Sequence, residues 1–476
     1  MTADVSSQSC HVSTLRRALS GYQMVGVLVL LAGFFSLATM KDQQPGGEAA
    51  ARSLARQLKR TDLGGAILVV VAPAGEEDAR FADSLARRVR ARGAGEPVVV
   101  TGDPAAVRQA LERLAARGPT RCVVATTEAS APVVRALLAG LSSLAGSRVL
   151  TPAPYRWPTF LLADNLRNVA NQIAVIAILA VGMTMVIITG GIDLSVGSLI
   201  ALAAVVTASL IGLMGGEGAG AGVMVLASLA TMALCGLVGA FSGLMVTRFK
   251  VPPFIATLAV MQVASGLAYI ISAGRPVYRV PESFVLLGRG AEPLLGIPYA
   301  VLLMVALYAV SHVVMSRTTL GRAVYAIGGN AEAARLAGVR VAGVLVLVYA
   351  TCGALAGLGG VVMASQLKSG APTYGLMYEL YVIAAVVVGG ASLAGGEGSV
   401  LGTLVGALII AVIQNGMNLT QVESYSQKVV LGLVILGAVL LDILKRRGWQ
   451  WLRRERFTSP ANVPAKPERT DGVNVP

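Results

Sequence analysis

The sequence predicts an all-α polytopic membrane bundle of about ten transmembrane helices, with a small extracytoplasmic α/β domain inserted near its start. Three observations predict this fold. Of the 476 residues, 55% are hydrophobic and only 13% are charged, against roughly 25% charged in an ordinary soluble domain. Apolar runs of about 20 residues, long enough to cross a bilayer, recur along most of the chain. A single long stretch, 41–158, interrupts them with clustered charges.

The N-terminal 20 residues are polar, and an apolar run over 22–39 follows them. Small residues at Ser36 and Ala38 resemble a signal-peptide cleavage site. The run is long for a signal peptide, however, and fits a first membrane helix better. We therefore expect a cytoplasmic N-terminal tail over 1–20 and a first transmembrane helix over 21–40. In either interpretation the next segment lies outside the cytoplasm.

The stretch 41–158 alternates short β-type runs with helical patterns. The β-type runs are 66–71, 97–101, 122–126 and 148–150, and helical patterns lie near 76–92, 104–117 and 131–144. This order predicts a small three-layer domain around a parallel sheet, with Asp103 capping a helix that begins at Pro104. The domain could be a platform for a partner protein, a ligand site at the strand ends or a spacer, and we favour the platform.

From 159 to 445 the chain is almost continuously apolar, which predicts a transmembrane core. We expect helices near 170–189, 196–214, 221–246, 254–273, 299–316, 343–364, 379–393, 400–416 and 428–444. With the first run these place both termini on one side of the membrane. The short loops and ends on that side contain Arg16, Arg17, Arg248, Lys250, Arg317, Arg322, Arg335, Arg340 and the basic cluster after 444. Since short cytoplasmic loops collect Lys and Arg, that side is cytoplasmic, with a basic, partly disordered tail over 446–476.

Two segments of the core resemble each other. Residues 235–243 (CGLVGAFSG) and 352–360 (CGALAGLGG) both present small residues on one helix face. Transporters often contain structural repeats, but close helix packing in lipid needs small-residue faces in any case. Both interpretations stay open from the sequence.

The motifs that are missing narrow the function. The chain contains neither a G-x-x-x-x-G-K-[ST] phosphate loop nor an H-E-x-x-H sequence, and its four cysteines form no C-x-x-C pair. We therefore expect no catalytic residues, no bound metal and no cofactor. The formal net charge is +14. In a soluble protein this would suggest nucleic acid, but here the cytoplasmic loops account for it, so we expect contact with membrane lipid and no nucleic acid.

The predicted cytoplasmic loop over 317–341 is the most informative polar segment. After Gly329, Asn330 can cap a short helix, Glu332 favours its first turn through the helix dipole, and Gly338 can end it. Ala333, Ala334 and Ala337 would make this helix slim enough to enter a groove in a partner protein. An ordinary amphipathic loop helix would have the same features.

These residues carry a family resemblance. The spacing Glu332-Ala-Ala-x-x-x-Gly338 resembles the coupling motif of ABC importer permeases. The segments 190–198 (GGIDLSVGS), 251–257 (VPPFIAT) and 321–341 resemble monosaccharide permeases of the ribose, xylose and arabinose type, and 274–276 and 388–399 add to the resemblance. It spans about 160–445. The insert over 41–158 departs from this family, which usually joins its first two helices by a much shorter connection.

The resemblance implies the membrane-spanning permease subunit of an ATP-driven importer in the inner membrane of the cell. It would translocate a small, pentose-like monosaccharide by alternating access. A cytoplasmic ABC ATPase subunit, which binds the ATP, would dock on 321–340 through Gly329, Asn330, Glu332, Ala333, Ala334 and Gly338. An extracytoplasmic sugar-binding protein would deliver the sugar, and a homodimer of the permease would form the pathway.

Several polar residues stand within the predicted spans. Intramembrane carboxylates such as Asp193 are functional candidates, but its Gly-rich surroundings favour a hinge or helix cap made of Asp193, Ser195 and Gly197. A second set could hydrogen-bond a solute in the pathway, although bonds between helices are commoner for such side chains. This set is Asn171, Gln172, Gln262 and Asn415. Glu397 could contact the ATPase or lie in a solvated turn, and 377–381 could line the outer mouth or anchor at the interface.

Three alternatives follow from the same residues. An ABC permease could carry another small polar solute, such as a branched-chain amino acid or a nucleoside. A stand-alone secondary transporter or channel would need ion-coupling residues such as paired carboxylates, and only Asp193 and Glu379 stand in or near the predicted spans. A sensor that uses the outer domain would need a partner other than an ATPase.

Overall fold

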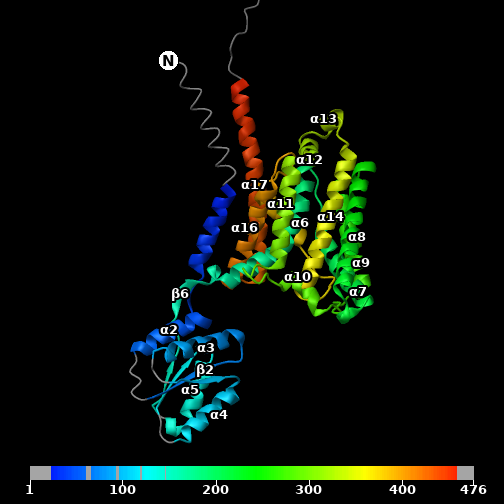
Figure 1. Cartoon of the computed structure of the whole chain (residues 1–476). Coiled ribbons are helices and arrows are strands. Elements are labelled where there is room, and N and C mark those ends of the chain that lie inside the picture. The colour runs from blue at the N-terminus through cyan, green and yellow to red at the C-terminus, as the bar shows by residue number, and fades with distance from the viewer. Residues whose placement is uncertain (1–22, 61–65, 93–95, 118–120, 145, 458–476) are drawn as a thin grey trace, which may run out of the picture. The chain divides into compact units, whose positions relative to one another are not determined.

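The computed structural model describes residues 23–60, 66–92, 96–117, 121–144 and 146–457. The chain divides into two compact units, one over 36–161 and one formed by the residues before and after it (Figure 1). The predicted cytoplasmic tail over 1–20 and the part of the predicted C-terminal tail after residue 457 lie outside the described residues.

The larger unit is a helical membrane bundle, as its composition predicts. Within the described chain, 7 helices are long and apolar enough to cross a membrane. They are α6 (Ala163–Ile188), α7 (Val196–Leu213), α8 (Ala221–Arg248), α9 (Pro253–Ser272), α11 (Tyr299–Arg317), α14 (Val341–Leu367) and α16 (Val400–Leu419). Shorter apolar helices are Gln23–Ala38, α15 (Tyr378–Val388) and the first part, Ser424–Leu440, of α17 (Ser424–Phe457). The connections contain η3 (Gly216–Gly218), η4 (Glu282–Val285), α10 (Leu286–Arg289), α12 (Thr319–Gly329) and α13 (Ala331–Leu336).

Three helix boundaries differ most from the sequence prediction. Helix α6 begins at Ala163 instead of near 170, because its first turns are polar and carry no hydropathy signal. Helix α15 ends at Val388 instead of near 393, since Gly390 follows with a φ of +92° that a helix cannot continue. Helix α17 continues to Phe457 instead of ending near 444, because the Arg and Lys residues there are good helix formers.

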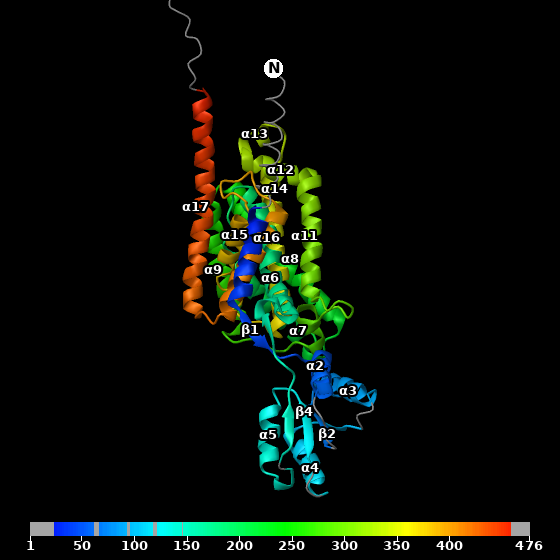
Figure 2. The same ribbon diagram turned by 90° about the vertical axis from the view of Figure 1, so that its left-hand side faces the viewer.

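Helix α6 forms the centre of the bundle. In its most apolar window, 89% of the residues are buried inside the protein, against 17% for α8. Helices α14, α16, α11 and α15 pack against it (Figure 2). A helix that is hydrophobic on all sides can be buried in this way, which leaves α8 and its neighbours to expose apolar side chains to lipid.

The two similar small-residue segments are the facing sides of one helix pair, which we call the α8–α14 seam and define by Gly239, Gly243, Gly353 and Gly357. A Cβ added to Gly353 would overlap the Cys235 carbonyl oxygen and would lie 3.1 Å from the Gly239 Cα. One added to Gly243 would lie 2.8 Å from the Val346 Cα. The two backbones therefore approach so closely that no side chain fits between them, which is how small residues pack helices in lipid.

The smaller unit contains a 4-stranded parallel sheet in the order β3-β2-β4-β5. The strands are β2 (Ile67–Ala72), β3 (Val98–Thr101), β4 (Cys122–Thr126) and β5 (Arg148–Leu150), and the helices are α2 (Gly47–Arg60), α3 (Glu76–Arg90), α4 (Pro104–Ala115) and α5 (Ala131–Ala139), followed by η1 (Ser142–Leu144). One apolar cluster around Phe81 and another around Leu111 fill separate layers. Helix α4 is capped by Asp103, whose Oδ1 accepts from the Ala106 nitrogen at 2.8 Å.

A two-stranded antiparallel ribbon joins the two ends of this unit. It pairs β1 (Met40–Gln43) with β6 (Tyr155–Pro158), so that Met40 lies opposite Pro158 and Gln43 opposite Tyr155. A short helix, η2 (Thr159–Leu161), follows. The Thr159 nitrogen donates to the Thr39 carbonyl at 3.0 Å, which extends the pairing by one more bond.

Candidate functional site

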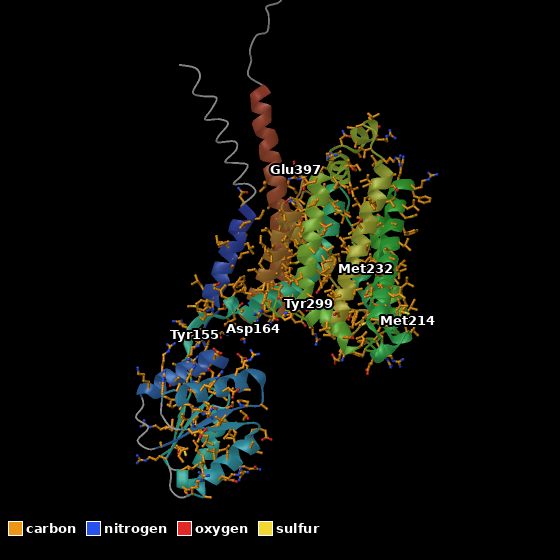
Figure 3. The ribbon with its side chains drawn as sticks, in the orientation of Figure 1. Tyr155, Asp164, Met214, Met232, Tyr299 and Glu397 are labelled. Carbon is orange, nitrogen blue, oxygen red and sulfur yellow. The ribbon has the colours of Figure 1, made fainter. Side chains whose placement is uncertain are left out.

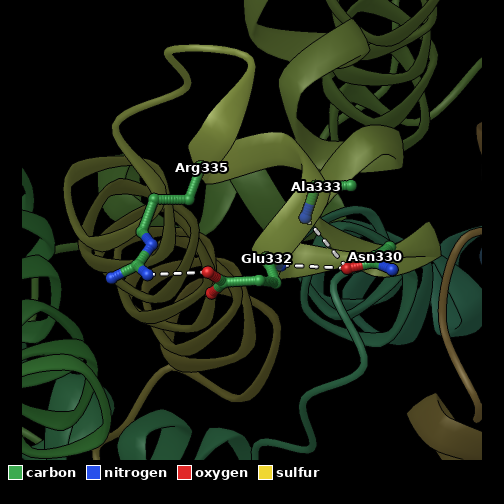
Figure 4. A network of polar contacts seen from close by, with 4 residues as sticks. All are labelled: Asn330, Glu332, Ala333 and Arg335. Atoms are coloured by element: carbon green, nitrogen blue, oxygen red, sulfur yellow. Dashed lines mark hydrogen bonds and ion pairs between the residues drawn. The ribbon is translucent and has the colours of Figure 1, made fainter.

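The loop singled out from the sequence forms two short helices, α12 and α13, which meet at Asn330. The Asn330 Oδ1 accepts hydrogen bonds from the Glu332 and Ala333 nitrogens, both at 3.0 Å (Figure 4). Backbone N–H groups at a helix start have no partner within the helix, and Asn is among the residues that satisfy them best. Asn330 thus ends α12 and caps α13.

Helix α13 is closed at its other end by Gly338. Gly338 has a φ of +86°, its nitrogen donates to the Arg335 carbonyl, and the Val339 nitrogen donates to the Ala334 carbonyl, both at 3.0 Å. These paired bonds with a left-handed glycine form a Schellman C-terminus. On the surface of the helix, Arg335 and Glu332 form an exposed ion pair at 2.7 Å (Figure 4).

The exposure of α13 is suited to a partner protein. Only Ala334 is buried and anchors the helix, whereas Glu332, Ala333 and Arg335 are exposed. Leu336 is 80% exposed. A short, rigidly capped helix that presents small residues and one leucine matches the helix-in-groove mode of protein recognition.

The end of helix α12 contacts the turn after α6 and the turn between α15 and α16. We call this contact region the glycine junction and define it by Gly190, Gly328, Gly395 and Gly396. A Cβ on Gly328 would overlap the Ile188 carbonyl oxygen at the end of α6 and would lie 2.5 Å from the Gly396 nitrogen. One on Gly395 would lie 2.9 Å from the Gly328 oxygen and 3.0 Å from the Gly190 nitrogen. Three segments that are far apart in sequence therefore touch backbone to backbone.

Hydrogen bonds hold the glycine junction together. The Gly396 nitrogen donates to the Ile188 carbonyl at 2.8 Å, and the Tyr325 hydroxyl of α12 donates to the Gly398 carbonyl at 2.8 Å. Burial raises the pKa of the Tyr325 hydroxyl, which keeps it protonated as a donor. Glu397 is exposed and lies toward the end of the bundle that carries α12 and α13, opposite Asp164, Met214 and Tyr299 (Figure 3).

The predicted hinge residues lie together at the start of α7. Asp193 is fully buried, and its Oδ1 accepts from the Ser195 nitrogen at 2.9 Å and from the Ser195 hydroxyl at 2.6 Å. Ser195 occupies the N-cap position but makes no side-chain cap bond, because its hydroxyl donates to Asp193. A Cβ on Gly197 would overlap the Glu379 carboxylate. These residues therefore fix the turn between α6 and α7.

The predicted pathway residues have different surroundings. The Asn171 side-chain nitrogen donates to the Gly288 carbonyl at 3.0 Å. Asn415 exchanges two amide hydrogen bonds with Asn165, at 2.9 and 3.0 Å, which tie α16 to α6. Gln172 and Gln262 are exposed. No hydrogen bond joins these four predicted side chains to one another within the described chain.

The chain between α14 and α15 passes through the bundle as irregular backbone, which the hydropathy pattern does not predict. A Cβ on Gly370 would overlap the Ala204 carbonyl oxygen, and one on Gly375 that of Gly197, both on α7. Helix α15 has 11 residues and spans about 16 Å, roughly half of a bilayer core. Irregular backbone at this depth is tolerated only inside protein or along a water-filled cavity, and broken helices surround the solute sites of many transporters.

Glu379 stands at the start of this short helix. Its side chain is half-buried and forms no ion pair with a described residue. Because an ionisable side chain that faces lipid is costly, an intramembrane carboxylate usually faces a bundle interior or a water-filled cavity. Within the described chain no group of 3 or more His, Cys, Asp or Glu residues is placed to hold a metal ion.

Comparison with known proteins places this geometry in a family. Residues 165–439 match the family described as the branched-chain amino acid transport system / permease component. The ribose import permease protein of Bacillus subtilis (strain 168) is 45% identical over 287 residues, which cover 60% of this chain and 86% of the relative. Its counterpart in Escherichia coli (strain K12) is 44% identical over 291 residues, 61% of this chain and 88% of the relative.

A third relative is the L-arabinose transport system permease protein of Escherichia coli (strain K12), 40% identical over 290 residues, which cover 61% of this chain and 86% of the relative. No solved structure matches the chain. The resemblance to monosaccharide ABC permeases is confirmed by these relatives. Since the family match covers more than half of the chain and nearly all of the helical bundle, this protein belongs to the family of branched-chain amino acid transport system permease components.

Proposed function

We propose that this protein is the membrane-spanning permease subunit of an ATP-driven importer that carries a small monosaccharide. The observation that carries the proposal is 40% to 45% identity over the bundle to permeases of ribose and of arabinose. Both sugars are pentoses, so the cargo is pentose-like. The ATP is bound by a separate ATPase subunit, and this chain contributes the path and the docking helix.

The end of the bundle that carries α12 and α13 faces the cytoplasm in this proposal. Its short loops contain Arg248, Lys250, Arg317, Arg322, Arg335 and Arg340. Lys and Arg in short loops are typical of the cytoplasmic side. If the shorter helices Gln23–Ala38, α15 and α17 accompany the 7 long ones across the bilayer, both termini are cytoplasmic and the protein is a multi-pass inner-membrane protein.

The unit over 36–161 then belongs outside the cytoplasm. It is inserted between the helix Gln23–Ala38 and α6, and Asp164 at the start of α6 lies at the end of the bundle opposite α13 (Figure 3). We favour a role in contacting the extracytoplasmic sugar-binding protein over a ligand site of its own. The family match begins only at residue 165, so this role rests on the position of the unit in the chain and not on the family.

The solute path forms between two copies of the permease, which alternate between outward and inward access. We place the irregular segment with Glu379 along this path, because its backbone breaks a span at membrane depth. Gln172 and Gln262 are proposed to contact the sugar through their exposed amides. Asn171 and Asn415 are proposed to line the same path while they hold neighbouring segments by hydrogen bonds.

Co-purification tests the docking helix and the function together. The chain is purified with its neighbouring gene products, and bound subunits are identified beside ATP-dependent uptake of labelled ribose into vesicles. Glu332→Arg breaks the exposed ion pair with Arg335 at i,i+3. Asp164→Arg is the matched control, since Asp164 forms an exposed i,i+3 pair with Arg167 at the opposite end of the bundle.

We expect an ATPase to accompany the wild-type chain and Asp164→Arg, and to be lost with Glu332→Arg together with uptake. An ATPase that binds all three chains equally would exclude α13 as the docking helix. A wild-type chain that imports sugar with no ATPase, or binds none, would instead favour the stand-alone transporter.

A further inference from the structure

We propose that the glycine junction transmits the ATPase movement from the docking loop to the helices of the solute path, with Gly328 as its central positioning residue. Binding of the ATPase to α13 does not by itself move the helices that line the solute path. The inference rests on the proposed function, because it requires an ATPase that binds α13. It adds which residues inside the permease turn docking into transport.

The first step of the argument is that α12 is fixed between two close backbone contacts. At its start, a Cβ on Gly321 would lie 2.6 Å from the Met315 Cα of α11, and the Thr318 hydroxyl accepts from the Gly321 nitrogen at 3.4 Å. At its end, Gly328 touches the Ile188 carbonyl. A helix held at both ends moves as one body, so a displacement of α13 reaches the glycine junction.

The second step is that the three turns contact each other through backbone atoms, with no side chain between them. Gly328 and Gly396 have no side chains, and their backbones lie within contact of Ile188 and of each other. Side chains can change rotamer and absorb a small shift, whereas backbone in direct contact must move with its neighbour. Energetic coupling through packed and hydrogen-bonded contacts of this kind is the physical basis for communication between sites.

The third step is where the two turns lead. The turn after α6 continues through Asp193 and Ser195 to α7, whose Gly197 packs on Glu379 and Gly375. The other turn joins α15 to α16. Because the Gly396 nitrogen donates to the Ile188 carbonyl, both turns shift together. The helices that border the irregular segment are thus the ones that the glycine junction moves.

Gly432 offers a control for Gly328. A Cβ added to Gly432 would meet no atom within 4 Å, whereas one on Gly328 would overlap the Ile188 carbonyl oxygen. Gly432 stands within α17 and Gly328 within α12, and alanine raises helix propensity at each. A difference between Gly328→Ala and Gly432→Ala therefore reports the backbone contact at Gly328 and not the change in helix propensity.

The test measures coupling in the full importer, reconstituted in liposomes with its ATPase and sugar-binding protein. The readouts are ATPase retained on the permease, ATP hydrolysed, and labelled ribose imported. Gly328→Ala should retain the ATPase but import about tenfold less sugar for each ATP hydrolysed, because the overlap forces the turns apart. Gly432→Ala should stay within about twofold of wild type in that ratio.

Tyr325→Phe gives a second, milder probe that decides the matter if Gly328→Ala does not assemble. It removes only the hydrogen bond to the Gly398 carbonyl, and the import for each ATP should fall about threefold to tenfold. If Tyr325→Phe and an assembled Gly328→Ala keep the wild-type ratio, or if Gly432→Ala loses as much as Gly328→Ala, the inference is overturned. If the wild-type chain binds no ATPase, the proposed function fails first.

Discussion

The α8–α14 seam and the glycine junction are both built from glycine backbone, yet they join different kinds of element. In the seam, Gly239 and Gly353 let two long helices lie against each other over several turns. In the glycine junction, Gly328 and Gly396 bring together the ends of helices and the turns between them. Contacts repeated along two helices hold them in one arrangement, whereas contacts confined to the helix ends leave the rest of each helix free to pivot. The same residue type can therefore fix a bundle or link a moving part to it.

The largest expected effect lies in the seam. Gly353→Ala should destabilise the bundle by about 1–3 kcal/mol, because its Cβ overlaps a backbone carbonyl that two packed helices cannot release. Gly343→Ala is the control in the same helix, where the nearest atom to the new Cβ is 4.0 Å away. Thermal unfolding of the purified protein in detergent measures the difference. Equal unfolding temperatures for the two variants would show that the close contact at Gly353 does not stabilise the bundle, which would contradict the stabilising role given to the seam.

The turn between α6 and α7 sharpens the comparison, because a buried side chain fixes it in addition to the glycine contacts. Asp193→Ala leaves the Ser195 nitrogen and hydroxyl without their acceptor, which should cost about 1–3 kcal/mol in a buried turn. Asp193→Asn keeps an oxygen acceptor and should recover part of that stability. Thermal unfolding of both variants beside wild type measures this order, and an Asn variant no better than Ala would show that the bonds to Ser195 do not hold the turn.

The smallest expected effect lies at Asn330, outside the bundle core. Asn330→Ala removes the cap of α13, worth about 1 kcal/mol, and should weaken ATPase binding about fivefold. The unfolding temperature of the bundle should not change, since α13 is exposed apart from Ala334. Asn330→Ser, which can also cap, is the control and should restore binding. A drop in unfolding temperature with unchanged ATPase binding would show that α13 stabilises the bundle, as the seam does, and does not bind the ATPase.

Local chemistry made part of this structure predictable. Long apolar runs located the membrane helices, and the roles of Asn330 and Gly338 could be read because a helix cap depends on residues within four positions. The α/β elements of 36–161 lie at the alternating runs because strand and helix periods differ within a few residues. Each of these features has its cause close by in the sequence.

Contacts between distant segments could not be read in the same way. The sequence makes Asn415 a candidate solute contact, but it does not indicate the amide partner Asn165, which stands 250 positions away. Hydropathy does not distinguish a surface loop from irregular backbone inside a bundle, so the course of the segment after α14 could not be predicted. One signal for the glycine junction was present, since Gly-Gly pairs occur at 190–191, 328–329 and 395–396. Nothing in a single sequence says that such pairs meet.

The ribbon of β1 and β6 also determines how the unit over 36–161 is connected to the rest of the chain. Because Met40 pairs with Pro158, the polypeptide leaves and returns at neighbouring points, about 5 Å apart in a sheet. An insertion whose ends are adjacent leaves no gap for the host to close, and such sites accept foreign domains most readily. The ribbon is thus an insertion site at which a whole domain could be inserted, exchanged or removed during evolution. A reporter domain with adjacent termini could be inserted at the same place in the laboratory.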